Sequence, residues 1–292
     1  MKNLKNIEYF GQIMYARRMA NTTIETYKCC IKNLSKYYNE DLSKITNEQI
    51  RQFLIHRVLV LKMSFSDENQ HINAIKLFYR TIYNKYIKAE FVKRPKQKQY
   101  IPDILTPKEV NQVIWNTQNI KHKCILFCIY NNGLRIGELL NLTLMDVRTK
   151  GVDKPFILIR NAKGHKARKL YLTKQCEDLI REYYCTHKPT PKYYLFEGQN
   201  HTQPYTSTSI RNILKAALKR EGIKKRVRVH DLRHAFATHC IISGTSLAHL
   251  APHLGHSSIK TLEKTYNHLK YDDLDIKRPT HHQTPVLKLK RA

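Results

Sequence analysis

A basic, proline-punctuated stretch between residues 88 and 107 limits what this chain can fold into more than any other feature. It contains Lys93-Arg94-Pro95-Lys96-Gln97-Lys98, then Pro102 and Pro107, and no apolar period runs through it. Such composition is typical of a linker, because proline ends helices and strands. At 292 residues the chain is long enough for two domains. We therefore expect a helical domain at 1–90, a basic linker at 91–105, a larger domain at 106–276 and a basic tail at 277–292.

The charge of the chain predicts a polyanionic partner. Lys and Arg number 52 against 23 Asp and Glu, a formal net charge of +29. Residues 1–100 carry 19 basic and 8 acidic side chains, so the excess is present in both halves. Basic side chains that neutralise phosphates release condensed counterions, and this release favours binding to nucleic acid. Both domains are therefore expected to contact nucleic acid, as a two-domain clamp would, and a basic linker between them would let them close around double-stranded DNA.

Apolar residues at helical spacing predict a bundle over residues 1 to about 90. Two capping boxes, Thr22-x-x-Glu25 and Thr46-x-x-Gln49, are expected to open helices, and a third helix is expected from about Asp67 to Tyr86. Along this third helix the apolar positions, Tyr86 among them, are expected to face inward. Four basic or imidazole side chains are expected to face outward, where they are either solvated or in contact with the DNA backbone: His71, Lys76, Arg80 and Lys85.

Cysteine and histidine usage argues against a disulfide framework and against a metal site. The seven cysteines form no Cys-x-x-Cys pair, and Cys29-Cys30 and Cys124/Cys128 lie in apolar helical patterns, so we expect reduced core thiols. The fifteen histidines are scattered. The N-terminus has no hydrophobic signal core, and the longest apolar run, 124–130, is too short for a membrane span. A cytoplasmic, DNA-associated protein without membrane contact is expected.

In the larger domain a short β-hairpin is expected within a mainly helical fold. Pro107 should occupy a first helical position, and a buried helix from Lys121 to Asn131 should end at Asn131-Asn132-Gly133. The next helix opens with Arg135, where free backbone N–H groups favour an anion, and Glu138 follows one turn later. The runs 156–160 and 168–172 read as paired strands with Lys163 at the turn between them.

The stretch 228–239 predicts a helix that presents a phosphate clamp. His230 and Arg233 lie three residues apart, so both project from one side, while Leu232, Phe236 and Cys240 form the buried face. An Arg fork matches phosphate oxygens, and a His can move a proton near neutral pH. After a break at Ser243-Gly244 come a helix at 247–254, the segment Gly255-His256-Ser257-Ser258, and a final helix carrying Tyr266 on its apolar stripe.

Five separated segments together resemble one family. They are, in order, Gly133-Leu-Arg-Ile-Gly-Glu138, Ala162-Lys-Gly-His-Lys-Ala-Arg168, His230-Asp-Leu-Arg-His234, Leu254-Gly-His-Ser-Ser258 and Tyr266-Asn-His268. The chain is similar to tyrosine recombinases of the phage-integrase and Xer type over nearly all of its length. The resemblance implies a helical core-binding, SAM-like domain followed by a catalytic domain. It departs from the common pattern at Ala162, where a glycine is usual, at Gly137, where serine is frequent, and at Pro252, inside the helix before Leu-Gly-His.

The resemblance also implies a role for each site residue. Arg135 and Arg233 would bind the non-bridging oxygens of the scissile phosphate, and Tyr266 would attack phosphorus to give a 3′-phosphotyrosyl link. Lys163, or alternatively Lys166 or Lys169, would protonate the leaving 5′-oxygen. His230 would assist proton transfer at the nucleophile, His256 would hydrogen-bond the phosphate, and Glu138 would support the site. Fixed charges stabilise the transition state without metal, and the covalent link removes the need for a nucleotide cofactor.

The implied function is site-specific recombination or integration, in which four protomers exchange strands on two duplexes through a Holliday junction. The sequence leaves open the DNA core site, an accessory or partner recombinase, and the choice among integration, excision, inversion and dimer resolution. One rival is a type IB topoisomerase, with the same chemistry on one duplex. The other is a DNA-binding protein without catalysis.

Overall fold

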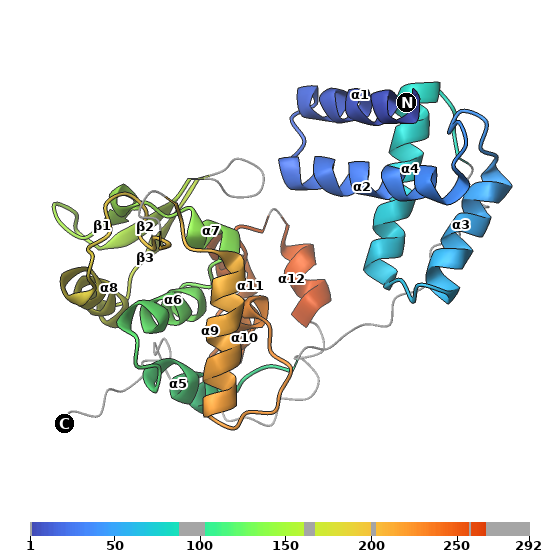
Figure 1. The fold of residues 1–292 in the computed structure, drawn as a ribbon. Coiled ribbons are helices and arrows are strands. Elements are labelled where there is room, and N and C mark those ends of the chain that lie inside the picture. Colours follow the sequence, from blue (N-terminus) through green and yellow to red (C-terminus); the bar gives the residue numbers. More distant parts are fainter. Residues whose placement is uncertain (1, 88–102, 161–166, 200–202, 257, 267–292) are drawn as a thin grey trace. The chain divides into compact units, whose positions relative to one another are not determined.

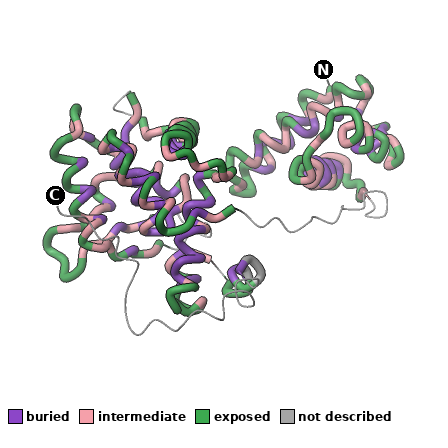
Figure 2. Tube along the Cα trace, turned by 90° about the horizontal axis from the view of Figure 1, so that it is seen from below, coloured by how far each residue is buried: buried purple, intermediate pink, exposed green. Residues whose placement is uncertain are grey.

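The computed structural model describes residues 2–87, 103–160, 167–199, 203–256 and 258–266. The chain divides into two compact units, residues 1–100 and 101–292, and each is described by itself. The linker at 91–105 lies almost entirely, and the tail at 277–292 entirely, outside the described residues. Each unit has its own hydrophobic core, and buried residues follow the inner faces of the helices (Figure 2).

The first unit consists of helices within its described part. In Figure 1, α1 and α2 run side by side and α4 crosses them. Phe10 and Phe78 meet edge to face with ring centroids 5.2 Å apart, which joins α1 to α4 in the core. The helices are α1 (Lys2–Ala16), α2 (Asn21–Tyr38), α3 (Asn47–Leu59) and α4 (Phe65–Tyr83).

Of the two capping boxes predicted for this unit, one is present and one is not. The Thr46 capping box is confirmed, because the Gln49 N–H donates to the Thr46 hydroxyl and the Gln49 side chain accepts from the Thr46 N–H. The box at Thr22 is wrong. Helix α2 already begins at Asn21, and its N-cap residue is Ala20, which makes no side-chain capping bond. Thr22 therefore lies inside the first turn.

Two side chains near the third expected helix point the opposite way from the prediction. His71 is buried, and its Nδ1 lies 2.8 Å from the carbonyl oxygen of Asp67, so it is not an outward contact. Tyr86 is 70% exposed, because α4 ends at Tyr83 and Asn84 takes a left-handed conformation. The extrapolated helical period therefore no longer applies at residue 86.

The second unit is mainly helical with a small sheet, as expected. Thr106 and Glu109 form a capping box around Pro107, and Gly133 stops α6 with φ of +59°. The helices are α5 (Pro107–Trp115), α6 (Ile120–Asn131), α7 (Ile136–Leu140), α8 (Lys174–Thr186), α9 (Ser207–Arg220), α10 (Val229–Ile242), α11 (Leu247–Leu254) and α12 (Ile259–Tyr266), with a 3-10 turn at Leu144–Asp146.

The hairpin is confirmed and has an additional strand. β2 (Phe156–Ile159) pairs antiparallel with β3 (Arg168–Tyr171), with Ile159 opposite Arg168. A two-residue strand, β1 (Val147–Arg148), joins the other edge of β2. Arg168 is the first residue of β3, and the turn predicted around Lys163, residues 161–166, lies outside the described residues.

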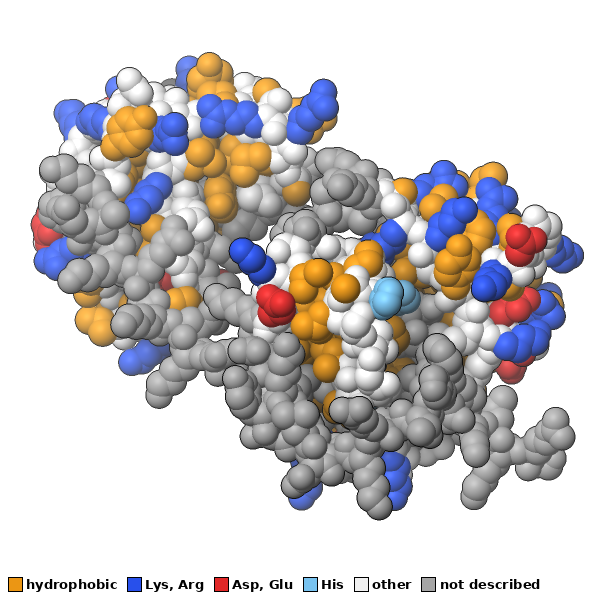
Figure 3. Space-filling model, turned by 180° about the vertical axis from the view of Figure 1, so that it is seen from behind, with side chains coloured by type: hydrophobic (Ala, Val, Ile, Leu, Met, Phe, Trp, Pro, Cys, Tyr) orange, Lys and Arg blue, Asp and Glu red, His pale blue; other side chains and the backbone are white. Residues whose placement is uncertain are grey.

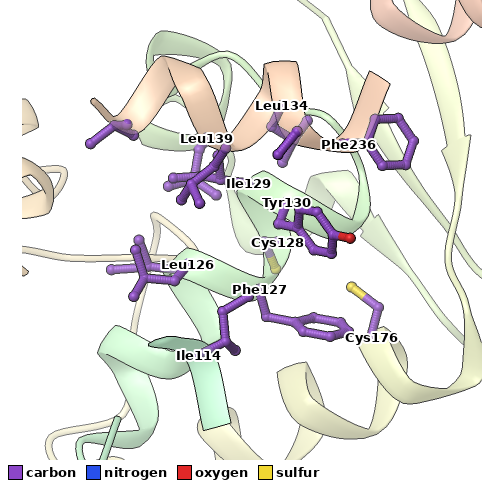
Figure 4. Packing of buried hydrophobic residues seen from close by; sticks show 14 of the residues in the cluster. Ile114, Leu126, Phe127, Cys128, Ile129, Tyr130, Leu134, Leu139, Cys176 and Phe236 are labelled. Atoms are coloured by element: carbon purple, nitrogen blue, oxygen red, sulfur yellow. The ribbon is translucent and has the colours of Figure 1, made fainter. Parts of the chain in front are cut away.

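Helices α6 and α10 form the centre of the second core. Figure 4 shows Phe236 of α10 near Leu134, and Cys128 of α6 in the same core as Cys176 of α8. The prediction of buried thiols holds for Cys30, Cys124 and Cys128, whereas Cys29 is exposed. Among the described residues no group of three or more His, Cys, Asp or Glu side chains is arranged to hold a metal ion.

Basic side chains are widespread on the described surface. Figure 3 shows Lys and Arg scattered over the visible face of each unit, with acidic side chains in only a few places. No helix within the described ranges is long and apolar enough to cross a membrane.

Candidate active site

Arg135 stands at the N-terminal end of α7, as the sequence predicts. The left-handed Gly133 turns the chain sharply after α6, so that Arg135 becomes the N-cap residue of α7 with extended backbone. A Cβ at Gly133 would lie 2.6 Å from a ring carbon of Phe236 and 2.7 Å from a methyl of Leu254, so glycine is required for contact as well as for conformation. The Arg135 side chain remains 26% exposed.

Glu138 is a buried carboxylate to which guanidinium groups converge. It accepts hydrogen bonds from the backbone N–H of Arg135 at 3.0 Å and from Nη1 of Arg135 at 2.8 Å. Arg168 donates to both carboxylate oxygens, at 3.0 and 2.9 Å. Burial alone would raise the pKa of Glu138, but the bonds from Arg168 and Arg135 outweigh it and the pKa is lowered. The carboxylate is therefore ionised and fixes both arginines.

Arg233 lies deeper than the other two arginines. Its Nη1 donates to the carbonyl oxygen of Gly133 at 2.7 Å, its Nη2 donates to that of Leu254 at 2.6 Å, and its guanidinium is 3.8 Å from Glu138. Burial and the positive charge of Arg135 lower the pKa of Arg233 to about 10, which still leaves it protonated at neutral pH. Three guanidinium groups thus surround one carboxylate, and the surplus positive charge favours an anion.

His256 joins the arginines from the segment after α11. Helix α11 continues through Pro252 and ends in a left-handed Gly255, where a Cβ would lie 2.8 Å from Nη1 of Arg168. Nε2 of His256 is 3.2 Å from Nη2 of Arg233, and Arg135 donates to the Gly255 carbonyl oxygen at 3.2 Å. Burial and the charges of Arg233 and Arg135 lower the pKa of His256 to about 4, so the ring is a neutral acceptor.

Tyr266 is at the end of α12 and is only 6% exposed. Its hydroxyl is 2.8 Å from Nδ1 of His234, on α10. His230, one helical turn earlier, lies on the surface, and its ring stands perpendicular to that of His234 with centroids 4.7 Å apart. Although the residue as a whole is exposed, its ring packs against His234, and this local desolvation, together with the charges of His234 and Arg233, lowers the pKa of His230 to about 4.

Most of the predicted site residues come together, and one lies outside the described residues. Arg135, Glu138, Arg233 and His256 form one connected cluster. Lys163 and its alternative Lys166 lie in the segment 161–166, outside the described residues. The third alternative, Lys169, is described, and its Nζ lies 4.8 Å from the ring centroid of Phe156, within the sheet.

The sequence predicts no role for two residues of the site. In the sequence Arg168 stands only at the end of a motif, although it donates to both oxygens of Glu138 and to the carbonyl oxygen of His253. His234 stands at the end of another motif, although it is the hydrogen-bond partner of Tyr266. A signal existed for His234, because it lies one helical turn after His230 on the same side of α10.

Comparisons with protein families cover both units. Residues 103–273 match the phage integrase family, and residues 7–89 match the phage integrase N-terminal SAM-like domain. Among curated proteins, a tyrosine recombinase of Thermosipho africanus is 29% identical over 88% of this chain and 93% of its own length. The tyrosine recombinase XerA of Pyrococcus horikoshii is 28% identical over 88% of this chain and 87% of its own.

Solved structures share the fold. A XerH site-specific recombinase bound to a palindromic difH substrate has a TM-score of 0.70 at 21% identity, covering 89% of this chain and 80% of that one. A lambda integrase dimer bound to a COC′ core site has a TM-score of 0.69 at 14% identity, covering 88% and 96%. The chain therefore belongs to the phage integrase family and is a site-specific tyrosine recombinase, an enzyme that cleaves and rejoins DNA.

Proposed function

We propose that the cluster around Glu138 binds the scissile phosphate of a duplex core site and that Tyr266 is the nucleophile. Arg135 and Arg233 bind the non-bridging oxygens, and His256 hydrogen-bonds the same phosphate. The observation that carries this proposal is the approach of Arg233 to both Glu138 and His256, at 3.8 and 3.2 Å, from segments far apart in the sequence. Fixed cations around a developing phosphorane lower its energy without reorganisation.

In the proposed reaction Tyr266 forms a bond to phosphorus, and the bond from phosphorus to the 5′-oxygen breaks. Lys163 gives that oxygen its proton, and His230 assists proton transfer on the side of the nucleophile. The product is a 3′-phosphotyrosyl bond and a free 5′-hydroxyl, which conserves the energy of the phosphodiester. The hydroxyl of Tyr266 is sheltered against His234 in the protein alone. For the reaction, the scissile phosphate must reach this hydroxyl where it lies beside His234.

Strand exchange further requires several copies of the chain. We propose a homotetramer on two duplexes, which passes through a Holliday junction. The structures of relatives bound to their DNA sites support a DNA partner. A monomeric topoisomerase would relax supercoils instead, and a non-catalytic DNA-binding protein would do neither.

The test is to trap the covalent adduct. A nicked suicide duplex loses its short 5′ fragment after cleavage, so the protein should accumulate on the DNA through Tyr266, identified by peptide mapping. Tyr266→Phe should form no adduct. The matched control is Tyr130→Phe, since Tyr130 is also buried and its hydroxyl is also 2.8 Å from a histidine of α10, His239. An adduct with Tyr266→Phe, or none with the wild type on its cognate site, would refute the proposal.

Mixing two duplexes of different lengths that carry the site separates the rivals. A recombinase yields hybrid-length products, whereas a topoisomerase relaxes a supercoiled plasmid and yields none.

A further inference from the structure

The side chain that contacts the Tyr266 hydroxyl, His234, has no role in the reaction proposed above. Nδ1 of His234 lies 2.8 Å from this hydroxyl, within hydrogen-bonding distance, and the two rings have centroids 6.1 Å apart. His234 belongs to α10 and Tyr266 to α12, so the contact depends on how two helices pack. Among the described contacts, His234 is the imidazole that touches the reacting oxygen.

The surroundings of His234 keep it in the form that accepts a proton. Burial lowers its pKa, Asp231 in the preceding turn acts in the opposite direction, and Arg233 and Arg228 lower it further. The uncharged ring can accept the phenolic hydrogen at Nδ1. Burial raises the pKa of Tyr266 above its usual value, while the Arg233 guanidinium lowers it, so the phenol does not ionise unaided near neutral pH. A nucleophile of this kind requires a base.

We propose that His234 is the general base that accepts the proton of Tyr266 during cleavage. This proposal rests on the proposed function of Tyr266 as nucleophile. The phenolic O–H bond breaks, and its proton passes to Nδ1 of His234 as the phenolic oxygen bonds to phosphorus. The bond between phosphorus and the 5′-oxygen breaks, and that oxygen takes a proton from Lys163. When the strand is rejoined, the imidazolium returns the proton to the departing tyrosine oxygen.

His230 takes a supporting place in this arrangement. It lies four residues before His234, and its ring packs edge-on against that of His234. This contact restricts rotation of the His234 ring, so that Nδ1 stays aimed at Tyr266. The two histidines of α10 thus act in series, with His234 next to the nucleophile and His230 behind it.

The experiment measures single-turnover cleavage of the nicked suicide duplex by three variants of the full chain. His234→Asn keeps an amide oxygen near the position of Nδ1, so it can hold the tyrosine but cannot take its proton. His234→Ala removes both abilities. The control is His239→Asn, because His239 is on the same helix and is 2.8 Å from another buried tyrosine hydroxyl, that of Tyr130.

Both His234 variants should slow cleavage by about 10²–10⁴-fold, the usual contribution of a general base, while DNA binding is retained. His239→Asn should cleave at close to the wild-type rate. A fluorinated tyrosine at position 266, which ionises more easily, should restore much of the rate of His234→Asn. A misfolded site would not be restored in this way.

Wild-type rates in His234→Asn would reduce His234 to a hydrogen-bond partner and overturn the proposal, as would a slow variant that fluorinated tyrosine does not restore. If the Asn variant does not fold, His234→Gln is measured by the same criteria. The wild-type reaction separates the two proposals. Adduct formation at Tyr266 with an unimpaired His234→Asn refutes only the base, whereas no adduct at Tyr266 in the wild type refutes the nucleophile.

Discussion

Replacing Glu138 by Gln should destabilise the second unit more than any exposed charge change. Four hydrogen bonds from Arg135 and Arg168 end on this carboxylate, and the Glu138, Arg168 and Arg233 side chains are only 5%, 11% and 4% exposed. The Gln amide would turn an NH₂ group toward arginine donors and leave three guanidinium charges without a carboxylate. Removal of one partner from a buried ion pair costs about 3–5 kcal/mol.

Calorimetry gives the measurement. A loss of about 3–5 kcal/mol corresponds to a drop in Tm of about 6–20 °C for a domain of this size. The control is Asp178→Asn, which breaks the ion pair with Lys174 at 2.7 Å on the surface of α8, where the side chains are 71% and 52% exposed. That change should cost less than about 1 kcal/mol, because exposed pairs contribute little.

The reasoning fails if Glu138→Gln and Asp178→Asn unfold within about 1 kcal/mol of each other, the upper end for an exposed pair. It would also fail if Glu138→Gln kept its Tm but lost cleavage, since the carboxylate would then act in the reaction and not in holding the arginines. Because the pKa of Glu138 is lowered in the folded protein, its contribution is present above the unfolded pKa and is lost as the pH falls through the folded pKa.

Three further outcomes are expected. Gly133→Ala should lower the free energy of unfolding by about 2–4 kcal/mol, because the new methyl group clashes with Phe236 and Leu254 in addition to the strain of a positive φ. Gly222 has a similar φ and no neighbour within 4 Å, so Gly222→Ala should lower it by only about 1–2 kcal/mol, measured by calorimetry for both variants. Tyr266→Phe should abolish the adduct yet bind the core-site duplex with unchanged affinity in a gel-shift assay, and a tenfold weaker affinity would contradict this. The pKa of His256 is lowered to about 4 in the folded chain, so its neutral form contributes stability above the unfolded pKa, and this contribution is lost as the pH falls toward 4. The Tm of His256→Asn should therefore fall less steeply than that of the wild type between pH 7 and 5, and parallel curves would contradict this expectation.

Much of the second unit could be predicted from short-range sequence signals for the ends of helices and strands. Pro107, the Asn132-Gly133 stop and the alternation of 168–172 each act within a few residues, so their signals could be read directly from the sequence. Arg135 was correctly expected at the start of a helix for the same reason. Thr22 shows the limit of such signals, since α2 begins at Asn21, one residue before the threonine, and the box is not used.

Contacts between distant segments were harder to predict. Nothing in the spacing of residues 138 and 168 indicates that Arg168 donates to both oxygens of Glu138, because the register of β2 and β3 decides where Arg168 points. The partnership of His234 with Tyr266 likewise requires α10 and α12 to meet. His71 was misplaced because its side chain could bond Asp67 within its own helix and tolerate burial.

The two carbonyl groups that hold Arg233 come from Gly133, just past the end of α6, and from Leu254, the last residue of α11. A helix end is where thermal fraying begins. Warming should therefore loosen the guanidinium before either helix melts. We expect the temperature of half-inactivation to lie below the calorimetric midpoint, with activity recovering fully on cooling from the interval between them.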